Sequence, residues 1–394
     1  MSKMTIQDVD IKGKKVIMRV DFNVPLDKEL RITDDRRIRE AVPTIRYALE
    51  NGAKKIILMS HLGRPDGKAV DNLRLNPIAK KLSELLKEPV KKLDDCVGDD
   101  IRAQIDSSSE RVILLENLRF HAEEEKNDAH FAKQLASLAE VFVNDAFGTA
   151  HRAHASTEGV THYLPSVAGF LLEKEIKYLG GSLEKPVKPF VVILGGAKVS
   201  DKIAVIDNLL PKSDAIIIGG GMAYTFLKAK GFAIGLSKLE ADKLDIAKQI
   251  LENARKQNVK ILLPVDHVIT QKIDDISNVR IVDINIPDGW IAVDIGPLTI
   301  QLFEEALKIA NTVVWNGPLG VFETEAFSKG TKDIANFIGN LKGVVSVIGG
   351  GDTAAAMAKF NLEDKMTHIS TGGGASLEYL EGKALPGIAA LKDK

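Results

Sequence analysis

The sequence predicts a two-domain α/β protein in which parallel sheets are flanked by helices. Its 394 residues exceed the size of one ordinary core and suggest two domains. Short apolar runs rich in β-branched residues recur along the whole chain, and amphipathic stretches with a period of about 3.6 residues separate them. Strands that alternate with helices in this way favour parallel sheets covered on both faces.

The expected strands fall into two groups. In the first half they are KKVIMRV (14–20), KKIILMS (54–60), RVILLE (111–116) and VFVND (141–145). In the second half they are FVVIL (190–194), AIIIG (215–219), KILLP (260–264), NTVVW (311–315) and VVSVIG (344–349). Helices are expected in HFAKQLASLAE (130–140) and SKLEADKLDIAKQILENARKQ (237–257).

The domain boundary is expected within 169–189, where a helical pattern reaches Gly180–Gly181 and two prolines precede the strand at Phe190. The closing segment carries apolar residues at Leu385, Ile388 and Leu391, which predicts that it docks on the protein.

Composition excludes several classes of function. A net charge of −1 argues against non-specific nucleic-acid binding. The polar N-terminus lacks the apolar core of a signal peptide, and no apolar run approaches the roughly 18 residues of a membrane span, so a cytoplasmic protein is expected. The single cysteine, Cys96, excludes an intrachain disulfide and a cysteine-based metal site, which fits a reducing compartment; we interpret it as a solitary thiol without function.

Four strands of the second half run into glycine clusters that are followed by helices. The segments are VVILGGAKVSDK, AIIIGGGMAYTF, VVSVIGGGDTAAA and HISTGGGASLE. Glycine allows a positive φ and a close approach of the backbone to a ligand, and the N-terminus of the following helix suits phosphate. The alternative is tight strand-to-helix packing without a ligand. Four such turns in one domain favour nucleotide binding, although none has the spacing of a P-loop.

The strands of the first half end in polar and basic residues instead. Arg64, Arg119 and Arg152 each come shortly after a strand, and His61 lies near the first of them. Because ligands bind at the carboxyl ends of parallel strands, these groups should converge, and guanidinium groups that converge indicate an anion site. The alternative is a solvated basic rim.

Three histidines also raise the question of a metal site, since His151 and His154 lie three residues apart and His121 lies upstream. No patterned Glu or Cys completes a ligand set, so zinc is the weaker interpretation. The two domains together therefore indicate a phosphoryl transferase with a small anionic acceptor. The H-R-D-x-x-x-x-N loop of protein kinases is missing.

Ten motifs in order resemble those of phosphoglycerate kinase in its bacterial length class, essentially from end to end: RVDFNVP, SHLGRP, LENLRF, DAFGTAHRAHAS, ILGGAKVSDK, GGGMAYTFLK, VVWNGPLGVFE, GGGDTAAA, STGGGASLE and EGKALPG. The resemblance implies reversible phosphoryl transfer between ATP and the carboxylate of 3-phosphoglycerate, which gives ADP and 1,3-bisphosphoglycerate in glycolysis and gluconeogenesis. It also implies Mg²⁺ dependence, a monomer, and hinge closure between two Rossmann-like domains. The implied division is a phosphoglycerate-binding domain over 1–170 with 376–394 packing back on it, a hinge helix over 171–188 and a nucleotide-binding domain over 189–375.

The resemblance also implies roles for residues of the first domain. The expected substrate ligands are Asp21, Asn23, His61, Arg64, Arg119 and Arg152. The catalytic arginine of the family falls in ITDDRRIRE, where alignment on Ile38 selects Arg37 over Arg36.

In the second domain the implied nucleotide ligands are Lys198, Lys202, Ala292, Asn316, Glu323, Gly350, Gly351, Asp352 and Thr353. Asp352 is also the implied Mg²⁺ ligand. Lys202, Gly372 and Gly373 are expected to face the transferring phosphoryl group, and the spacing of Lys198 and Lys202 suggests one face of a helix. One departure is visible: GWIAVDIGP has Ala292 where the family usually has glycine, which puts fine nucleotide affinity in question.

Two other functions fit a two-sided crevice. A nucleotide-sugar or phosphosugar transferase would need a different acceptor site from HLGRP and FGTAHRAHAS. A non-enzymatic sensor of phosphorylated metabolites would bind the same ligands without turnover, which is poorly matched to a chain that retains Arg37, Lys202 and Asp352.

Overall fold

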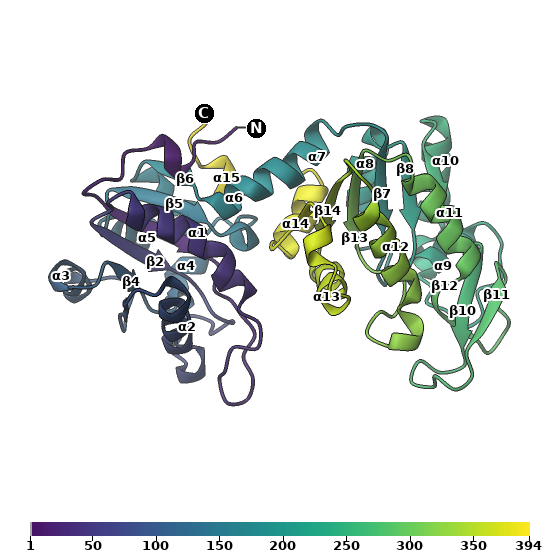
Figure 1. Cartoon of the computed structure of the whole chain (residues 1–394), viewed down its shortest axis with the longest axis horizontal. Helices are drawn as coiled ribbons and strands as arrows, with labels where there is room; N and C mark the ends of the chain where they lie inside the picture. Colours follow the sequence, from purple (N-terminus) through teal and green to yellow (C-terminus); the bar gives the residue numbers. More distant parts are fainter. Residues whose placement is uncertain (1) are drawn as a thin grey trace. The chain divides into compact units, whose positions relative to one another are not determined.

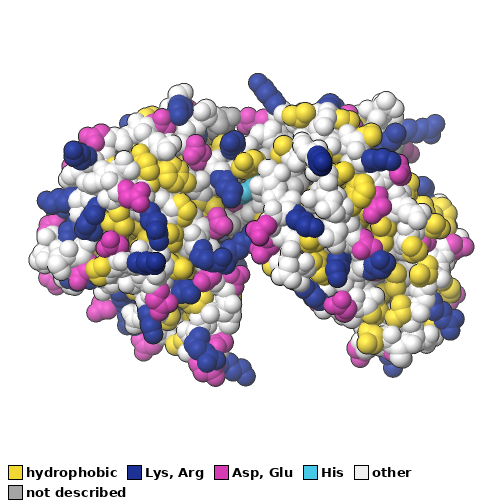
Figure 2. All heavy atoms as spheres, in the orientation of Figure 1, with side chains coloured by type: hydrophobic (Ala, Val, Ile, Leu, Met, Phe, Trp, Pro, Cys, Tyr) yellow, Lys and Arg dark blue, Asp and Glu magenta, His cyan; other side chains and the backbone are white. Residues whose placement is uncertain are grey.

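The structure, a computed structural model, describes residues 2–394, which form two compact units (Figure 1). The first unit comprises the residues up to Ile176 together with Ala384–Lys394, and the second comprises Lys177–Lys383. Among the described residues, no helix combines the length and the apolar character that crossing a bilayer would require. Basic and acidic side chains are interspersed over the visible face of each unit (Figure 2), in line with the net charge near zero.

The first unit is built on a six-stranded parallel sheet with the order β3-β4-β2-β1-β5-β6. Its strands are β1 (Lys15–Val20), β2 (Lys55–Met59), β3 (Val90–Lys92), β4 (Val112–Leu114), β5 (Val141–Asp145) and β6 (Ser166–Ala168). Its helices are α1 (Arg36–Glu50), α2 (Asn76–Leu86), α3 (Asp99–Ser107), α4 (Ala122–Glu125), α5 (Ala129–Ala136), α6 (Phe170–Glu175) and α15 (Pro386–Ala389).

The core of the first unit lies on both faces of this sheet. Val16, Met18 and Val20 of β1 pack in one cluster with apolar residues of α1 and α2. The alternate residue Ile17 is also fully buried, as is Ile57 of β2. Burial on both faces explains why these strands are continuous apolar runs without polar alternation.

The end of the chain is an integral part of the first unit. Leu385, Ile388 and Leu391 are 2–4% exposed, as their apolar pattern predicts. The backbone N–H of Met4 donates to the carbonyl of Lys392 (2.9 Å), so the two ends of the chain lie side by side (Figure 1). The preceding helix α14 (Gly374–Leu380) packs instead on α8 (Ile203–Leu209) within the second unit.

The second unit contains a six-stranded parallel sheet with the order β15-β14-β13-β7-β8-β9. Its strands are β7 (Phe190–Leu194), β8 (Ala215–Ile218), β9 (Lys260–Leu262), β13 (Thr312–Asn316), β14 (Val345–Gly349) and β15 (His368–Ile369). Besides α8 and α14, its helices are α7 (Gly181–Glu184), α9 (Ala223–Ala229), α10 (Leu244–Lys256), α11 (Pro297–Leu307), α12 (Lys329–Asn340) and α13 (Gly351–Lys359). The helix expected over 237–257 is α10, which begins only at Leu244, later than the amphipathic pattern suggests.

A second, antiparallel sheet of three strands was not anticipated from the sequence. It consists of β10 (Asp266–Thr270), β11 (Arg280–Asp283) and β12 (Ile291–Ile295) in the order β11-β10-β12. The chain also passes through a π-helical stretch, Ile176–Gly180, between α6 and α7.

Asp294 of β12 is a buried carboxyl group that links stability to pH. It is 1% exposed, and its oxygens accept the backbone N–H groups of Ile295 (2.9 Å) and Gly330 (2.7 Å). Burial disfavours the charged form and raises the pKa of Asp294 from 3.8 to about 7. Between these two values the unfolded chain has lost a proton that the folded protein keeps, so this group makes stability fall as pH rises.

We expect the variant Asp294→Asn, which mimics the neutral acid, to lose this part of the pH dependence. Relative to the unmodified protein, its free energy of unfolding should rise by a few kcal/mol between about pH 4 and about pH 7. Urea unfolding at several pH values measures the slope, and the exposed Asp288→Asn serves as the control. Equal slopes for Asp294→Asn and the unmodified protein would contradict the assignment.

Candidate functional site

The first unit gathers its expected ligands at the carboxyl ends of four strands that are neighbours in the order β4-β2-β1-β5. Asp21 and Asn23 follow β1, His61 and Arg64 follow β2, Arg119 follows β4, and Arg152 follows β5. Residues from segments far apart in the sequence therefore reach one edge of the sheet, as parallel topology requires.

Arg37 and Asp21 form an ion pair at this edge. Nη1 of Arg37 lies 2.7 Å from Oδ2 of Asp21, which is 7% exposed, whereas the Arg37 side chain is 33% exposed. Oδ1 of Asp21 accepts the N–H of Asn23 (3.2 Å), and Oδ1 of Asn23 accepts the N–H of Gly63 (2.9 Å). These contacts connect the loop after β1 to the loop after β2 and hold Arg37 with part of its guanidinium group accessible.

His61 is buried beside arginine side chains and is neutral. It is 3% exposed, and its Nδ1 lies 3.1 Å from Nη2 of Arg19. Burial, together with the charges of Arg19, Arg119 and Arg37, lowers the pKa of His61 well below 6.5. Because Arg19 can only donate, Nδ1 of His61 accepts, which leaves Nε2 with its proton as a donor.

Arg119 and Arg152 share a single carboxylate. Nε of Arg119 lies 3.1 Å and Nη1 of Arg152 lies 4.0 Å from Oε1 of Glu125. Burial lowers the pKa of Arg119; Glu125 opposes this effect and the neighbouring Arg152 adds to it. Arg64 is exposed in the loop after β2.

The charges of this region favour an anion. We call the guanidinium groups of Arg19, Arg37, Arg119 and Arg152 the arginine cluster. They face three carboxylates, those of Asp21, Glu124 and Glu125, and neutral histidines. Glu124 is itself buried, which raises its pKa. Positive charge is therefore in excess, and a phosphate or carboxylate group would balance it.

The structure separates the three histidines considered as metal ligands. The one group with metal-ligand spacing among the described residues contains His121 but neither His151 nor His154. Nδ1 of His154 instead lies 3.8 Å from Oε1 of Glu124. Burial, together with the charges of the nearby arginines, lowers the pKa of His154 to about 3.

In the second unit the glycine turns serve two different purposes. A Cβ on Gly195 would lie 2.1 Å from the carbonyl oxygen of Pro318, so packing alone requires glycine there. A Cβ on Gly196, Gly351 or Gly373 would meet nothing within 4 Å, although the positive φ values of Gly196 (+99°) and Gly373 (+51°) already favour glycine. Tight packing thus accounts for only part of the glycines, and the open positions leave backbone accessible to a ligand.

A cavity of about 350 Å³ lies beside these turns. Its wall is largely apolar and includes Gly196, Tyr224 and Ala292, while the carboxylates of Glu323 and Asp352 also line it. An apolar cavity with a few polar groups suits a base and a sugar. Three expected nucleotide ligands, Ala292, Glu323 and Asp352, are therefore brought together.

The other expected nucleotide ligands are not among the residues that line this cavity: Lys198, Lys202, Asn316, Gly350, Gly351 and Thr353. Nζ of Lys202 donates to Oδ1 of Asn316 at the end of β13, and Thr353 accepts the N–H of Gly317 (2.7 Å). Burial lowers the pKa of Lys202, whereas nearby carboxylates, among them Asp352, oppose this effect.

The expectation that Lys198 and Lys202 share a helix face is wrong. Helix α8 begins at Ile203, after both lysines, and Lys202 is its N-cap residue. The glycines before this helix let the chain turn without regular structure, so the two lysines lie on a loop, with Lys198 exposed.

Helix N-termini follow the last two glycine turns. Gly350 has a φ of +88° and precedes α13, whose first turn carries Asp352. Gly372 and Gly373 precede α14, and Gly373 has a φ of +51°. The N–H groups of a first helical turn lack partners within the helix, which suits phosphate oxygens.

Two residues of these sites were not singled out from the sequence. Arg19 lies within the apolar strand β1, and its Nε donates to Oγ of Ser156 (2.8 Å). A charged residue inside a buried strand is a signal that could have identified it. Glu240 accepts hydrogen bonds from the N–H (3.1 Å) and the hydroxyl (2.6 Å) of Ser200, between the two lysines. No spacing pattern connects Glu240 to that loop.

Comparison with known proteins agrees with this arrangement. The family model described as phosphoglycerate kinase matches residues 6–383. Curated phosphoglycerate kinases from Dictyoglomus turgidum and Thermosipho africanus are 58% and 56% identical over 399 residues; the match covers 100% of this chain and 100% and 99% of those proteins.

Solved structures agree as well. The structure of phosphoglycerate kinase from Coxiella burnetii matches with a TM-score of 0.90 and 42% identity, and that from Pyrococcus horikoshii matches with 0.84 and 34%. Each match covers 98% of both chains. The chain therefore belongs to the phosphoglycerate kinase family and is a glycolytic enzyme that transfers a phosphoryl group between ATP and 3-phosphoglycerate.

Proposed function

We propose that the arginine cluster of the first unit binds 3-phosphoglycerate and that the glycine turns and cavity of the second unit bind the nucleotide. The main support is the excess of guanidinium charge around the neutral His61. In this proposal His61, Arg64, Arg119 and Arg152 hold the phosphate end of the acceptor. Asp21 and Asn23 contact its hydroxyl and carboxylate region.

The chemistry needs charge stabilisation and no general base. The acceptor carboxylate is already ionised at neutral pH. The difficulty is that an anion must approach a triphosphate, so catalysis consists of positioning and electrostatic stabilisation. We assign this role to Arg37 on the acceptor side and to Lys202 with the N–H groups of Gly372 and Gly373 on the nucleotide side.

Mg²⁺ fits the nucleotide site through Asp352. This carboxylate is exposed, lines the cavity and lies in the first turn of α13. Mg²⁺ typically binds one or two carboxylates and otherwise phosphate oxygens and water, so a single protein ligand suffices. When bound, the ion neutralises charge on the phosphates. In this proposal Thr353 and Gly350–Gly351 belong to the same phosphate turn, and Glu323 contacts the ribose.

We expect Asp352→Ala to weaken the use of MgATP. The half-saturating Mg²⁺ concentration at fixed ATP should rise by at least about tenfold, because loss of a direct ligand should cost no less than loss of a supporting residue. Initial rates titrated with Mg²⁺ measure this, and Glu252→Ala, which removes an exposed carboxylate of α10 that does not line the cavity, is the control. An unchanged Mg²⁺ dependence in Asp352→Ala would exclude this metal assignment.

Transfer requires the bound acceptor and the bound nucleotide to meet, so we propose hinge closure about 171–188. The proposed domains are 1–170 and 189–375, and of the closing segment 376–394 only the residues from Ala384 onward pack on the first of them. Closure would also exclude water, which would otherwise hydrolyse the acyl phosphate product. We further propose that the enzyme is monomeric and cytoplasmic. Its mass in solution, measured by light scattering, tests whether it is a monomer.

The decisive experiment couples the reaction to glyceraldehyde-3-phosphate dehydrogenase and NADH. Oxidation of NADH that requires ATP, Mg²⁺ and 3-phosphoglycerate together supports the proposal. Binding of both substrates by folded protein without NADH oxidation would favour a sensor.

A further inference from the structure

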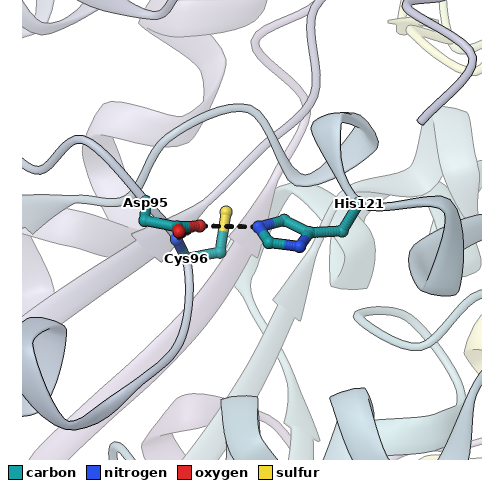
Figure 3. A group of neighbouring side chains, drawn as sticks. All are labelled: Asp95, Cys96 and His121. Atoms are coloured by element: carbon teal, nitrogen blue, oxygen red, sulfur yellow. Dashed lines mark hydrogen bonds and ion pairs between the residues drawn. The ribbon is translucent and has the colours of Figure 1, made fainter. Parts of the chain in front are cut away.

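Three potential metal ligands converge in the first unit, outside the proposed substrate site. Asp95 and Cys96 lie in the loop between β3 and α3, and His121 lies between the 3-10 helix Leu118–Phe120 and α4. Figure 3 shows the Asp95 carboxylate directed at the imidazole, with the Cys96 sulfur beside this contact. Oδ1 of Asp95 lies 2.6 Å from Nε2 of His121, and the three ligand atoms all lie within 4.8 Å of one another.

Contacts around the three side chains hold them in this arrangement. The N–H of Cys96 donates to Oδ1 of Asp95 (2.7 Å), and Sγ of Cys96 lies 3.0 Å from the carbonyl oxygen of Glu116. The His121 ring packs against the ring of Phe131 with centroids 5.0 Å apart. Cys96 is fully buried, whereas Asp95 and His121 have side chains that are 52% and 26% exposed, so an ion could reach the group from solvent.

The electrostatic environment favours a cation. Burial raises the pKa of the Cys96 thiol, and the charges of Asp95, Glu116 and Glu124 raise it further. Lys92 acts in the opposite direction, but its Nζ is already paired with Glu116 and, at 3.0 Å, with Asp94. Carboxylates therefore set the sign of the potential at the sulfur.

We propose that Asp95, Cys96 and His121 form a binding site for a divalent cation that accepts sulfur ligands, such as Zn²⁺. One carboxylate, one thiolate and one imidazole are all accepted ligands of Zn²⁺, and water would complete a tetrahedral set. Mg²⁺ prefers oxygen ligands and near-octahedral geometry, so it should not compete. The view of Cys96 as a solitary thiol, drawn from the cysteine count, overlooked a mixed ligand set.

Binding requires small and definable changes. Zn²⁺ ligand distances of about 2.0–2.3 Å place ligand atoms roughly 3.5 Å apart, so the Asp95–His121 hydrogen bond opens and the sulfur moves closer. The thiol proton and the proton in the hydrogen bond between Nε2 of His121 and Asp95 both leave to solvent as the metal–ligand bonds form, and uptake should therefore increase with pH. The bound ion would join the loop after β3 to the segment that carries Arg119, two residues before His121.

Co²⁺ is the probe that singles out this site. The chain has one cysteine, so any thiolate-to-cobalt charge-transfer band in the near ultraviolet reports Cys96 alone. We expect such a band at one Co²⁺ per chain, its loss on adding Zn²⁺, and no effect of Mg²⁺. Zn²⁺ should also raise the Tm, because it binds only the folded state.

Variants test each ligand. Cys96→Ser should abolish the band. Asp95→Asn and His121→Asn should each weaken Co²⁺ binding at least about tenfold, because mutating a residue that only supports a metal ligand already lowers metal affinity by that factor. His162→Asn is the matched control, because His162 pairs with Glu158 (2.7 Å) with no thiol in the pair. Circular dichroism establishes that each variant is folded. A folded protein without the band at excess Co²⁺, or a band that survives His121→Asn at full affinity, would overturn the proposal.

Discussion

Arg37→Ala is expected to lower kcat by roughly 10²–10³-fold, the usual cost of removing one group that stabilises a transition state. The KM for 3-phosphoglycerate should change much less, because the proposed phosphate ligands are other residues. The Arg37 guanidinium is partly accessible and already anchored by Asp21, so it is held without reorganisation for a charge that develops during transfer. Steady-state kinetics with both substrates varied would separate the two constants.

Arg36→Ala is the matched control, since it removes the same group one residue earlier on α1. It should retain kcat near that of the unmodified enzyme. Arg37→Ala also leaves the buried Asp21 without its partner, so urea unfolding of this variant must accompany the kinetics. A raised KM with intact kcat would assign Arg37 to substrate binding alone.

Lys202→Met is expected to be comparably severe, with kcat lower by roughly 10²–10³-fold. Methionine retains the length of the side chain and removes the charge. Burial lowers the pKa of Lys202, and the carboxylates of Asp201, Asp352 and Glu381 oppose this effect. Because the ammonium group is only partly solvated, its charge acts strongly on a nearby phosphoryl group. Loss of this charge should therefore appear in the chemical step, which single-turnover kinetics with ATP measures.

Lys198→Met is the control on the same loop. Lys198 is exposed, so its loss should mainly raise the KM for ATP. Both variants replace one lysine of the same loop with methionine, so they differ only in which ammonium group is lost. If Lys198→Met and Lys202→Met had the same effect on kcat, the special role of Lys202 would be lost.

Most of the parallel architecture could be read from the sequence because both faces of each sheet are buried. Strands such as β1, β2, β7 and β8 are therefore continuous apolar runs that stand out from their surroundings. The short strands β3, β6 and β15 have two or three residues, and unlike the equally short β4 and β9 they do not lie in a continuous apolar run. The antiparallel sheet escaped notice because β10–β12 carry charged residues such as Asp266, Arg280 and Asp294 among their apolar ones.

The sequence by itself determined the fold class, the glycine turns, the basic ends of the first four expected strands and the family resemblance. These are local properties: a run of apolar residues, a turn that needs glycine, a motif of adjacent residues. Only the tertiary structure decided which glycines are required by packing, that Arg19 supports His61, and that Glu240 holds the lysine loop. It also placed Cys96 beside His121. Such contacts join residues far apart in the chain, and no spacing rule encodes them because they depend on how the loops at the sheet edges pack.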